Sequence, residues 1–334
     1  MPFMRLKQCL VLILPLHMQI VKDGPIQALA SAKTREYMTM LLGGDERLCK
    51  ALIPEFPIGT RRMTPAPGYL EALRKDNVEV VVGNVEKFVA DGIEMDSGEV
   101  LKVDAIICAT GFDLSFCPRF PLIGREGDLR DIWSDETPRA YMSCAVEGMP
   151  NYFSKSSPGN TTASRLRDPI LSLDSRLMRN SSLVAFLGPN APIGHGSVFT
   201  LSEHIAKYIV RVLKKCQTEH IRAIVPTRDA VDDYNEHIAQ FMPRTAWAAP
   251  GRSWFKAGRE DGPVIALHPG SRVHFFHMLE DFRGEDFEYV YDAAENETGR
   301  ARQNRFAYLG NGFSVRELDP ESDSTWYLSQ SAVV

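Results

Sequence analysis

The spacing of apolar and polar positions predicts several helices in this chain. Residues 28–42 place apolar side chains among polar ones and are followed by two glycines, which predicts a helix with a glycine stop. Asp45 can cap a second, short helix that a proline ends. Residues 202–215 repeat apolar positions at helical spacing and finish on lysines, and residues 229–242 predict another helix with an acidic start.

Strand patterns are concentrated between the first two helices and the later ones. Residues 78–82 are rich in valine and predict a strand, and residues 88–95 and 100–103 predict a hairpin around a glycine turn. Residues 104–109 are apolar on both faces and stop at Thr110-Gly111, so they predict a short buried strand. In an open α/β sheet, ligands bind beyond the carboxyl ends of the strands, where small residues let a cofactor approach the backbone.

Composition narrows the possible partners. The chain has 334 residues, enough for one large or two ordinary domains, with 44% hydrophobic and 24% charged residues. The net charge of -5 gives no indication of a nucleic-acid partner. The six cysteines include no Cys-x-x-Cys pair, which argues against a zinc site or a disulfide framework and favours a reducing, cytoplasmic compartment. His274 and His277 have ligand-like spacing but no supporting third ligand, so we interpret them as structural and predict no metal.

Residues 1–27 form a separate apolar N-terminus. Basic residues precede the apolar run Cys9–Leu14, an arrangement with the outline of a signal peptide, but no small-x-small cleavage site follows directly. The run is also too short to span a bilayer. We therefore interpret it as a buried strand and predict no membrane association, with a secretory or membrane role as the alternative.

Two loops contain the candidate binding residues. Residues 57–68 include five prolines and glycines and hold Arg61 and Arg62, whose guanidinium groups can bind phosphate; the other interpretation is a solvated surface pair. Residues 186–198 run from a short apolar strand into small residues, whose backbone N–H groups can cradle a phosphate or bind a flat heteroaromatic edge. His195 lies in this loop and is more typical of a packing or capping histidine than of an acid–base catalyst.

Four motifs, taken in order, resemble the C-terminal half of a Baeyer–Villiger monooxygenase of the flavin-containing monooxygenase superfamily. Each motif alone is weak, but the ordered set is specific, and it is most similar to fungal enzymes of secondary metabolism. The resemblance covers about residues 28–320, apart from residues 154–185. The motifs are Gly59–Leu70, Ile107–Asp113, Leu187–Pro192 and Ser253–Phe255.

This resemblance implies an α/β fold and a chemistry. The fold would be an incomplete, Rossmann-like flavoprotein fold with two dinucleotide-binding domains and helical elements. Residues 28–109 would hold the end of a helical segment and the remainder of an NADPH-binding domain, and residues 110–334 the C-terminal part of an FAD-binding domain. FAD, reduced by NADPH, would react with O2, and an oxygen atom would be inserted beside the carbonyl of a small-molecule ketone to give an ester or lactone.

The resemblance also implies roles for particular residues. Arg62 would be the catalytic residue, lying over the flavin and stabilising the negative charge of the oxygenating species and the developing oxyanion. Arg61 would take the place of the basic residue near the NADPH 2′-phosphate, and Trp254 would contact the nicotinamide nucleotide. Thr110-Gly111 would form the hinge strand between the two domains. Gly196-Ser197 would belong to the loop that meets the flavin ring.

Two departures from the family pattern leave other functions open. No Gly-x-Gly-x-x-Gly occurs in the 334 residues, whereas the family carries two, so most of the FAD affinity is expected to be missing. Residues 154–185 form a polar insertion, predicted to be disordered, that splits one buried strand; we interpret it as a retained intron or gene-model error, with a genuine surface insertion as the alternative. The chain could then be a non-catalytic remnant that does not bind FAD by itself, or one that needs a complementing chain. N- or S-oxygenation is a further alternative, which Arg62 disfavours.

Overall fold

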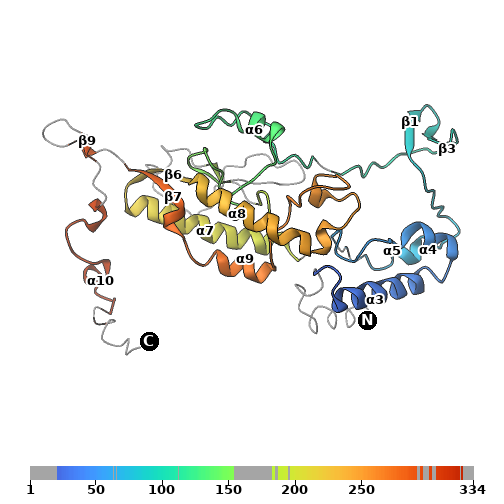
Figure 1. Cartoon of the computed structure of the whole chain (residues 1–334), viewed down its shortest axis with the longest axis horizontal. Helices are drawn as coiled ribbons and strands as arrows, with labels where there is room; N and C mark the ends of the chain where they lie inside the picture. Colours follow the sequence, from blue (N-terminus) through green and yellow to red (C-terminus); the bar gives the residue numbers. More distant parts are fainter. Residues whose placement is uncertain are drawn as a thin grey trace.

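The computed structural model describes residues 21–62, 64, 66–111, 113–153, 183–184, 187–194, 196–291, 294–295, 301–302, 306–323 and 325 (Figure 1). Its helices are α3 (Pro25–Leu41), α4 (Glu46–Leu52), α5 (Tyr69–Ala72), α6 (Leu129–Asp135), α7 (Val198–Thr218), α8 (Arg228–Phe241), α9 (Arg272–Met278) and α10 (Val315–Leu318). Its strands are β1 (Val85–Val89), β2 (Gly92–Met95), β3 (Val100–Lys102), β4 (Tyr152–Phe153), β5 (Leu183–Val184), β6 (Ile221–Pro226), β7 (Phe287–Tyr291), β8 (Ala294–Glu295) and β9 (Ala301–Arg302). The α/β class expected from the sequence is confirmed.

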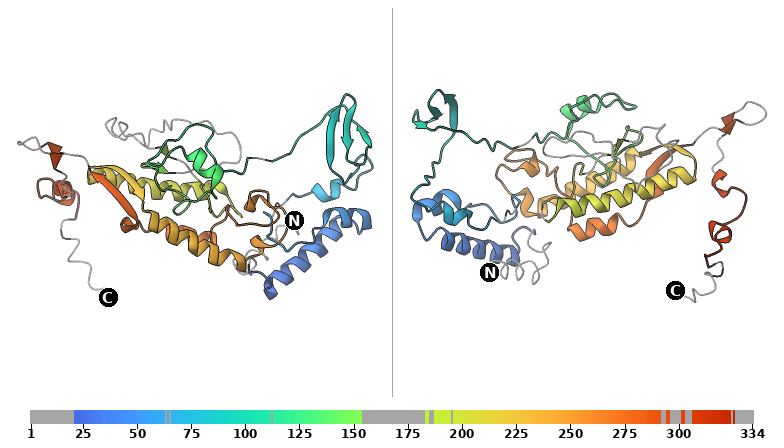
Figure 2. Two further views of the ribbon diagram at one scale, coloured as in Figure 1. Left: turned by 45° about the horizontal axis from the view of Figure 1, so that its top comes forward. Right: turned by 180° about the vertical axis from the view of Figure 1, so that it is seen from behind.

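Helices α7, α8 and α9 and the antiparallel pair β6–β7 form the main hydrophobic core. Figures 1 and 2 show α7 and α8 running side by side, with β6 and β7 near one end. The buried stripe of α7 follows helical spacing: Leu201, Ile205, Tyr208, Ile209 and Val212. Burial of each large apolar side chain contributes about 1.5–3 kcal/mol, so this core is the main source of stability in the region.

The four helices predicted from the sequence are confirmed. The first begins at Pro25, a residue suited to the first helical position, and therefore starts three residues before the expected boundary at residue 28. Asp45 caps α4 as expected, because its carboxylate accepts a hydrogen bond from the Leu48 N–H at 2.9 Å. The predicted helices at 202–215 and 229–242 correspond to α7 and α8.

The predicted hairpin is present as part of a three-stranded antiparallel meander, β1-β2-β3. This meander stands apart from the main core in all views (Figures 1 and 2). Gly92 is required at its first turn, because a Cβ there would collide with the Leu101 carbonyl of the neighbouring strand. Most of its side chains are exposed, including Phe88 at 63%.

Two strand predictions were wrong. Residues 78–82 form no strand, and residues 104–109 are an exposed extended segment and not a buried strand. Ile107 is 94% exposed and Ile106 41%. An apolar strand is stabilised only when neighbouring strands pair with it and other residues cover its faces, and among the described residues no strand lies alongside either stretch.

The polar stretch 154–185 is described only at its end. Leu183–Val184 form β5, which pairs in parallel with β4. The predicted disorder of the stretch as a whole stays a prediction. The two strand pieces on either side of the stretch are therefore neighbours in a sheet, whereas the sequence predicted one interrupted strand. The rest of the stretch lies outside the described residues, as do His195 and residues 1–20, which include the apolar run Cys9–Leu14.

The first described residues contact the main core. Val21 forms an antiparallel bridge with Thr245, and the Lys22 N–H donates to the Arg244 carbonyl at 2.8 Å. Residue 27, where the sequence predicts a domain boundary, lies within α3, and the division into domains stays a prediction. Across the described parts of the chain, no helix combines the length and apolar character that crossing a membrane would need.

Candidate functional site

The loop Pro57–Arg62, called the basic loop below, is fastened to two other parts of the structure. Thr60 is 1% exposed; its hydroxyl donates to the Pro57 carbonyl at 2.8 Å, and the Ala246 carbonyl lies 3.2 Å away. On the side of α3, the Gln27 amide donates to the Ile58 carbonyl at 3.1 Å. These bonds set the position of the loop while its last two residues remain exposed.

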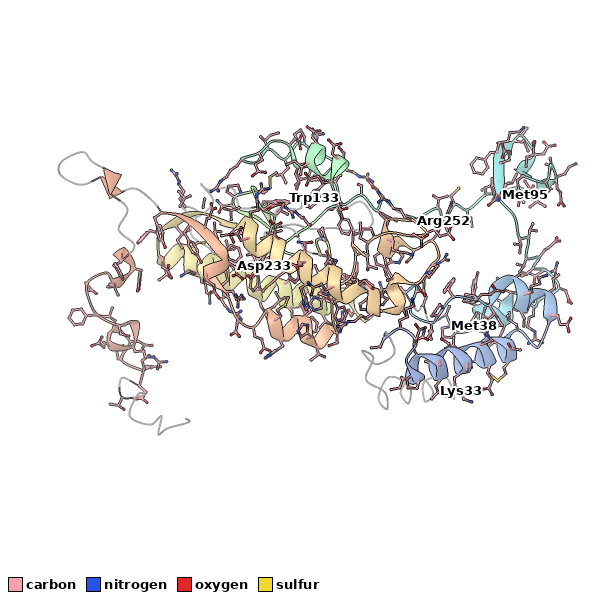
Figure 3. The ribbon with its side chains drawn as sticks, in the orientation of Figure 1. Lys33, Met38, Met95, Trp133, Asp233 and Arg252 are labelled. Carbon is pink, nitrogen blue, oxygen red and sulfur yellow. The ribbon has the colours of Figure 1, made fainter. Side chains whose placement is uncertain are left out.

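Arg61 and Arg62 leave this loop toward different partners. The Arg61 Nε donates to the Arg252 carbonyl at 3.1 Å. The Arg61 guanidinium carbon lies 5.0 Å from the centre of the Phe56 ring, within the range of a cation–π contact. Figure 3 labels Arg252, whose carbonyl accepts the first of these contacts. Arg62 Nη2 donates to the Gly196 carbonyl at 3.0 Å. The structure thus brings Arg62 to the loop that the resemblance assigned to the flavin ring.

Gly196 and Ser197 form the turn that leads into α7. Gly196 has φ +75, a left-handed conformation, and a Cβ at this position would collide with the guanidinium of Arg272. Arg272 Nη2 donates to the Ser197 carbonyl. Ser197 is the N-cap residue of α7, but its side chain makes no capping bond, so the first N–H groups of a 21-residue helix are left for other acceptors.

The motif Leu187–Pro192 is buried and is held by Asn190. The Asn190 side-chain amide donates to the Val264 carbonyl at 3.1 Å and to the Leu267 carbonyl at 3.0 Å, and its backbone N–H donates to the Ile265 carbonyl at 2.8 Å. Its φ of +62 is one that asparagine tolerates better than most residues. Asn190 belongs to a motif that was recognised in the sequence, but this role was not predicted; an asparagine directly after Gly-Pro was the available signal.

Trp254 opens a short 3-10 helix, Trp254–Lys256, that begins beside the basic loop. The Ser253 hydroxyl donates to the Thr60 carbonyl at 3.1 Å, which ties the residue before Trp254 to the residue before Arg61. Trp254 is half-buried and packs edge-on against Phe255, with ring centres 4.5 Å apart. The turn that carries Trp254 therefore lies against the loop that carries both arginines.

Thr110 and Gly111 are not brought to this group. Both are exposed, and Thr110 makes no side-chain hydrogen bond to another described residue. Gly111 has φ +90, so a glycine is suited to this turn for a local reason. Their assignment as a hinge near the cofactors stays a prediction.

A histidine pair lies around the start of α9, where His268 precedes the helix and His274 belongs to it. His268 Nε2 and His274 Nδ1 are 2.9 Å apart, and the Tyr234 hydroxyl is 3.3 Å from His268 Nδ1. Burial, and then the neighbouring histidines, lower the pKa of His268 to about 3, so its ring is neutral at ordinary pH. His277 instead faces Glu280 at 3.4 Å. Among the described residues no group of three or more His, Cys, Asp or Glu is arranged to hold a metal ion.

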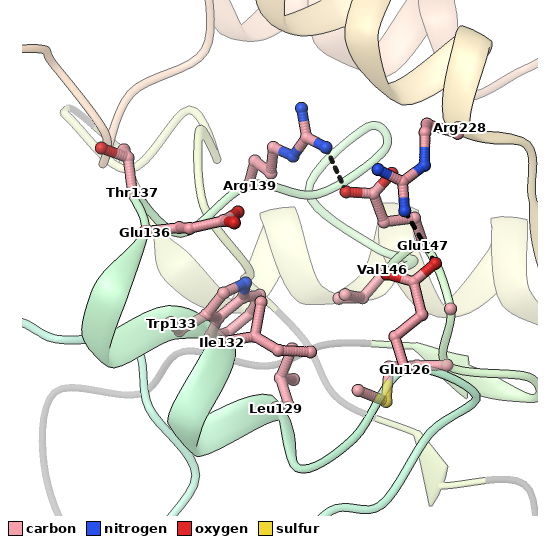
Figure 4. Close-up of a pocket in the computed structure, with 12 residues that line it drawn as sticks. Glu126, Leu129, Ile132, Trp133, Glu136, Thr137, Arg139, Val146, Glu147 and Arg228 are labelled. Carbon is pink, nitrogen blue, oxygen red and sulfur yellow. Dashed lines mark hydrogen bonds and ion pairs between the residues drawn. The ribbon is translucent and has the colours of Figure 1, made fainter.

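A cavity of about 130 Å³ lies beside α6 (Figure 4). Trp133 and Val146 belong to its apolar side, and two ion pairs flank it: Arg228 with Glu126 at 2.7 Å, and Arg139 with Glu147. None of its lining residues belongs to the basic loop or to residues 187–197, so this cavity is separate from the Arg62 region.

The chain is similar in sequence to fungal monooxygenases. It is 36% identical over 295 residues to the FAD-binding monooxygenase stcW of Emericella nidulans, a match that covers 88% of this chain and 42% of that protein. It is 35% identical over 274 residues to the FAD-binding monooxygenase moxY of Dothistroma septosporum, covering 82% and 37%. The chain is a relative of the FAD-binding monooxygenases. It spans less than half the length of these two relatives, and no family model matches it.

Comparison with solved structures identifies the fold of this chain, a relative of the FAD-binding monooxygenases. Cyclohexanone monooxygenase from Rhodococcus sp. Phi1, bound to NADP+, matches with a TM-score of 0.62 at 22% identity, covering 81% of this chain and 46% of that one. Oxidized steroid monooxygenase bound to NADP matches with a TM-score of 0.60 at 20% identity, covering 82% and 47%. The expected Rossmann-like flavoprotein fold, in part, is confirmed, whereas the roles of individual site residues stay predictions.

Proposed function

We propose that this chain contributes the arginine side of the active site of a Baeyer–Villiger-type monooxygenase. In this reaction a small-molecule ketone and O2 give an ester or lactone, with FAD and NADPH as cofactors. The observation that supports the proposal is the Arg62 Nη2 bond to Gly196, which joins the basic loop to the small-residue turn at the start of α7. The similarity to fungal FAD-binding monooxygenases supports the same reaction class.

The residues around this bond fit a flavin and a nicotinamide nucleotide. The uncapped N–H groups of α7 leave donors for a flat, electron-rich ring edge. Arg61, with its remaining N–H donors, would hold the NADPH 2′-phosphate, and Trp254 would stack against the nicotinamide nucleotide. The flavin, when bound and reduced, supplies the activation of O2.

Arg62 would supply positive charge where negative charge develops on oxygen. Among the described residues Arg62 makes one side-chain bond to a neutral carbonyl, which leaves four of the five guanidinium N–H donors for a ligand. Removal of one such preorganised donor typically lowers kcat by about 10²–10³-fold. Arg62→Ala should therefore lose ketone oxygenation by about this factor while flavin binding is retained.

The first experiment is spectroscopic. The purified full chain is incubated with FAD and freed of unbound cofactor, and absorbance in the flavin bands is recorded. A coloured protein then permits the Arg62→Ala comparison, with Arg35→Ala as the matched control, because Arg35 is also exposed and also donates to one carbonyl, that of Pro54 at 3.2 Å. Lactone formation that survives in Arg62→Ala would contradict the role assigned to this residue.

A second candidate is a non-catalytic protein that does not bind FAD by itself. The exposed apolar segment at residues 104–109, with Ile107 at 94%, favours this candidate, because the surface that should border a nucleotide is uncovered. A colourless chain that takes up no added FAD would support it. A complementing chain would then restore flavin binding when mixed with this one.

The biological setting belongs to the same proposal. The relatives stcW and moxY are fungal proteins, and a role in secondary-metabolite biosynthesis in the cytoplasm fits this similarity. Assays of ketones against amines and sulfides separate Baeyer–Villiger chemistry from N- or S-oxygenation. Product from amines or sulfides alone would move the assignment to the latter class.

A further inference from the structure

The cavity beside α6 has one apolar side and one charged side (Figure 4). Trp133, Val146 and Met149 line the apolar side; all three are buried and belong to one hydrophobic cluster. The volume of about 130 Å³ is many times the roughly 10–15 Å³ that a single water molecule needs. The cavity therefore has room for a small organic molecule with an apolar part.

The two guanidinium groups on the charged side are already paired with carboxylates. Arg228 Nη2 donates to Glu126 at 2.7 Å. Arg139 donates to Glu147 through one nitrogen and to Asp232 through another. Each positive charge at the cavity thus faces at least one negative charge, so the charged side offers an anion no uncompensated cation.

The carboxylates are less completely paired. The lining residues carry three carboxylates, those of Glu126, Glu136 and Glu147, against the two guanidinium groups. Glu136 follows directly after α6, and its side chain bonds to no other described residue. In Figure 4 this side chain extends toward the interior of the cavity. Oε2 of Glu147 is buried and has no hydrogen-bond donor, which is costly for an oxygen of a charged group.

We propose that this cavity binds a primary ammonium group carried on a short apolar chain. An ammonium has three N–H donors, so it can bond to Glu136 and to the unpartnered oxygen of Glu147 at once. The chain would lie on Trp133 and Val146 and be removed from water there, and an indole ring also attracts a cation. A bare metal ion matches less well, because in the described part of the chain no three His, Cys, Asp or Glu side chains are arranged to hold one.

Calorimetric titration of the full chain with n-butylammonium chloride, at neutral pH and low ionic strength, tests this site. Glu136→Gln removes one exposed charge and should weaken binding about two- to fivefold, and Glu147→Gln should weaken it at least about tenfold. Asp135→Asn is the matched control, because Asp135 is the neighbouring exposed carboxylate but does not line the cavity; it should leave binding unchanged. Since Glu136 bonds to no other described residue, its substitution leaves folding intact even where Glu147→Gln lowers stability.

Other probes separate the contribution of the charge from that of the chain. Methylammonium, which lacks most of the chain, should bind roughly tenfold or more weakly than n-butylammonium, and n-butanol, which lacks the charge, should also bind more weakly. Butanol or butyrate that binds as tightly as n-butylammonium would overturn the proposal. So would the absence of n-butylammonium binding, its displacement by potassium chloride at equal ionic strength, or equal losses in Glu136→Gln and Asp135→Asn.

A last titration, with Nα-acetyl-lysine amide, distinguishes two sources of the same ammonium group. Binding tighter than that of n-butylammonium indicates the lysine side chain of a polypeptide, and weaker binding indicates a free small amine. The site does not rest on the proposed oxygenation, because none of the cavity residues belongs to the basic loop or to residues 187–197. Failure of flavin binding would therefore leave this result unaffected.

Discussion

Replacement of Asn190 by alanine should strongly destabilise the loop that leads to Gly196. The side-chain amide makes two buried bonds, to the carbonyls of Val264 and Leu267 at 3.1 and 3.0 Å, and the residue is 3% exposed. Loss of these bonds costs roughly 1 kcal/mol each, with a further penalty for carbonyls left unpaired. Alanine at φ +62 adds roughly 1 kcal/mol of backbone strain. The expected total is about 3–5 kcal/mol.

The assay is urea unfolding of the full chain followed by tryptophan fluorescence, since Trp247 and Trp254 both contact the main core. Asn190→Gly keeps the left-handed backbone without strain but also lacks the amide, so it should be about 1 kcal/mol more stable than Asn190→Ala. Asn84→Ala is the matched control, because its amide makes an exposed bond to Asp96 at 2.8 Å. Equal, small losses below about 1 kcal/mol for Asn190→Ala and Asn84→Ala would refute this reasoning.

Two further predictions concern pH and the exposed apolar segment. In the folded chain His268 has a pKa of about 3 and stays neutral, whereas in the unfolded chain its ring binds a proton below about pH 6.5. The free energy of unfolding should therefore fall as the pH drops from 6.5 toward 3, by at most about 1.4 kcal/mol per pH unit. Urea midpoints at several pH values should show this slope reduced in His268→Gln, and an unchanged slope would contradict it. Ile107→Lys should change the free energy of unfolding by less than about 0.5 kcal/mol, because the side chain is 94% exposed. The same substitution removes an exposed apolar side chain and should therefore reduce the self-association measured by light scattering. A loss of several kcal/mol would show that Ile107 is buried in solution.

The helices could be predicted from the sequence because their signals are local. The Asp45 cap and the glycine pair after α3 act within one turn of the helices that they bound. The strand prediction for residues 104–109 was wrong for the opposite reason. A strand depends on neighbouring strands that are distant in sequence, and a hydrophobic run does not specify which strands these are. Prediction of a strand therefore required information that the segment itself does not contain.

In the candidate site, too, the contacts between residues distant in sequence could not be predicted from local patterns. The proximity of Arg62 to Gly196 joins positions 134 residues apart and followed from the resemblance, since no local pattern links them. Arg272 was missed because an arginine at the start of a short helix has no distinctive sequence signal. Its significance comes from the missing Cβ of Gly196 and the nearby charge of Arg62, which only the folded chain reveals.

The anchoring of the basic loop determines how far the candidate site depends on the rest of the chain. Thr60 is bonded to Ala246 and Ser253, which belong to the segment packed on the main core, and no hydrogen bond among the described residues joins Thr60 to residues 78–111. The exposed state of residues 104–109 therefore does not displace Arg62. This chain can hold Arg61 and Arg62 in place while the surface expected to border a nucleotide stays uncovered. Cofactor binding and the placement of the arginines are therefore separable properties. Substitutions in the basic loop and in residues 104–109 should affect them independently.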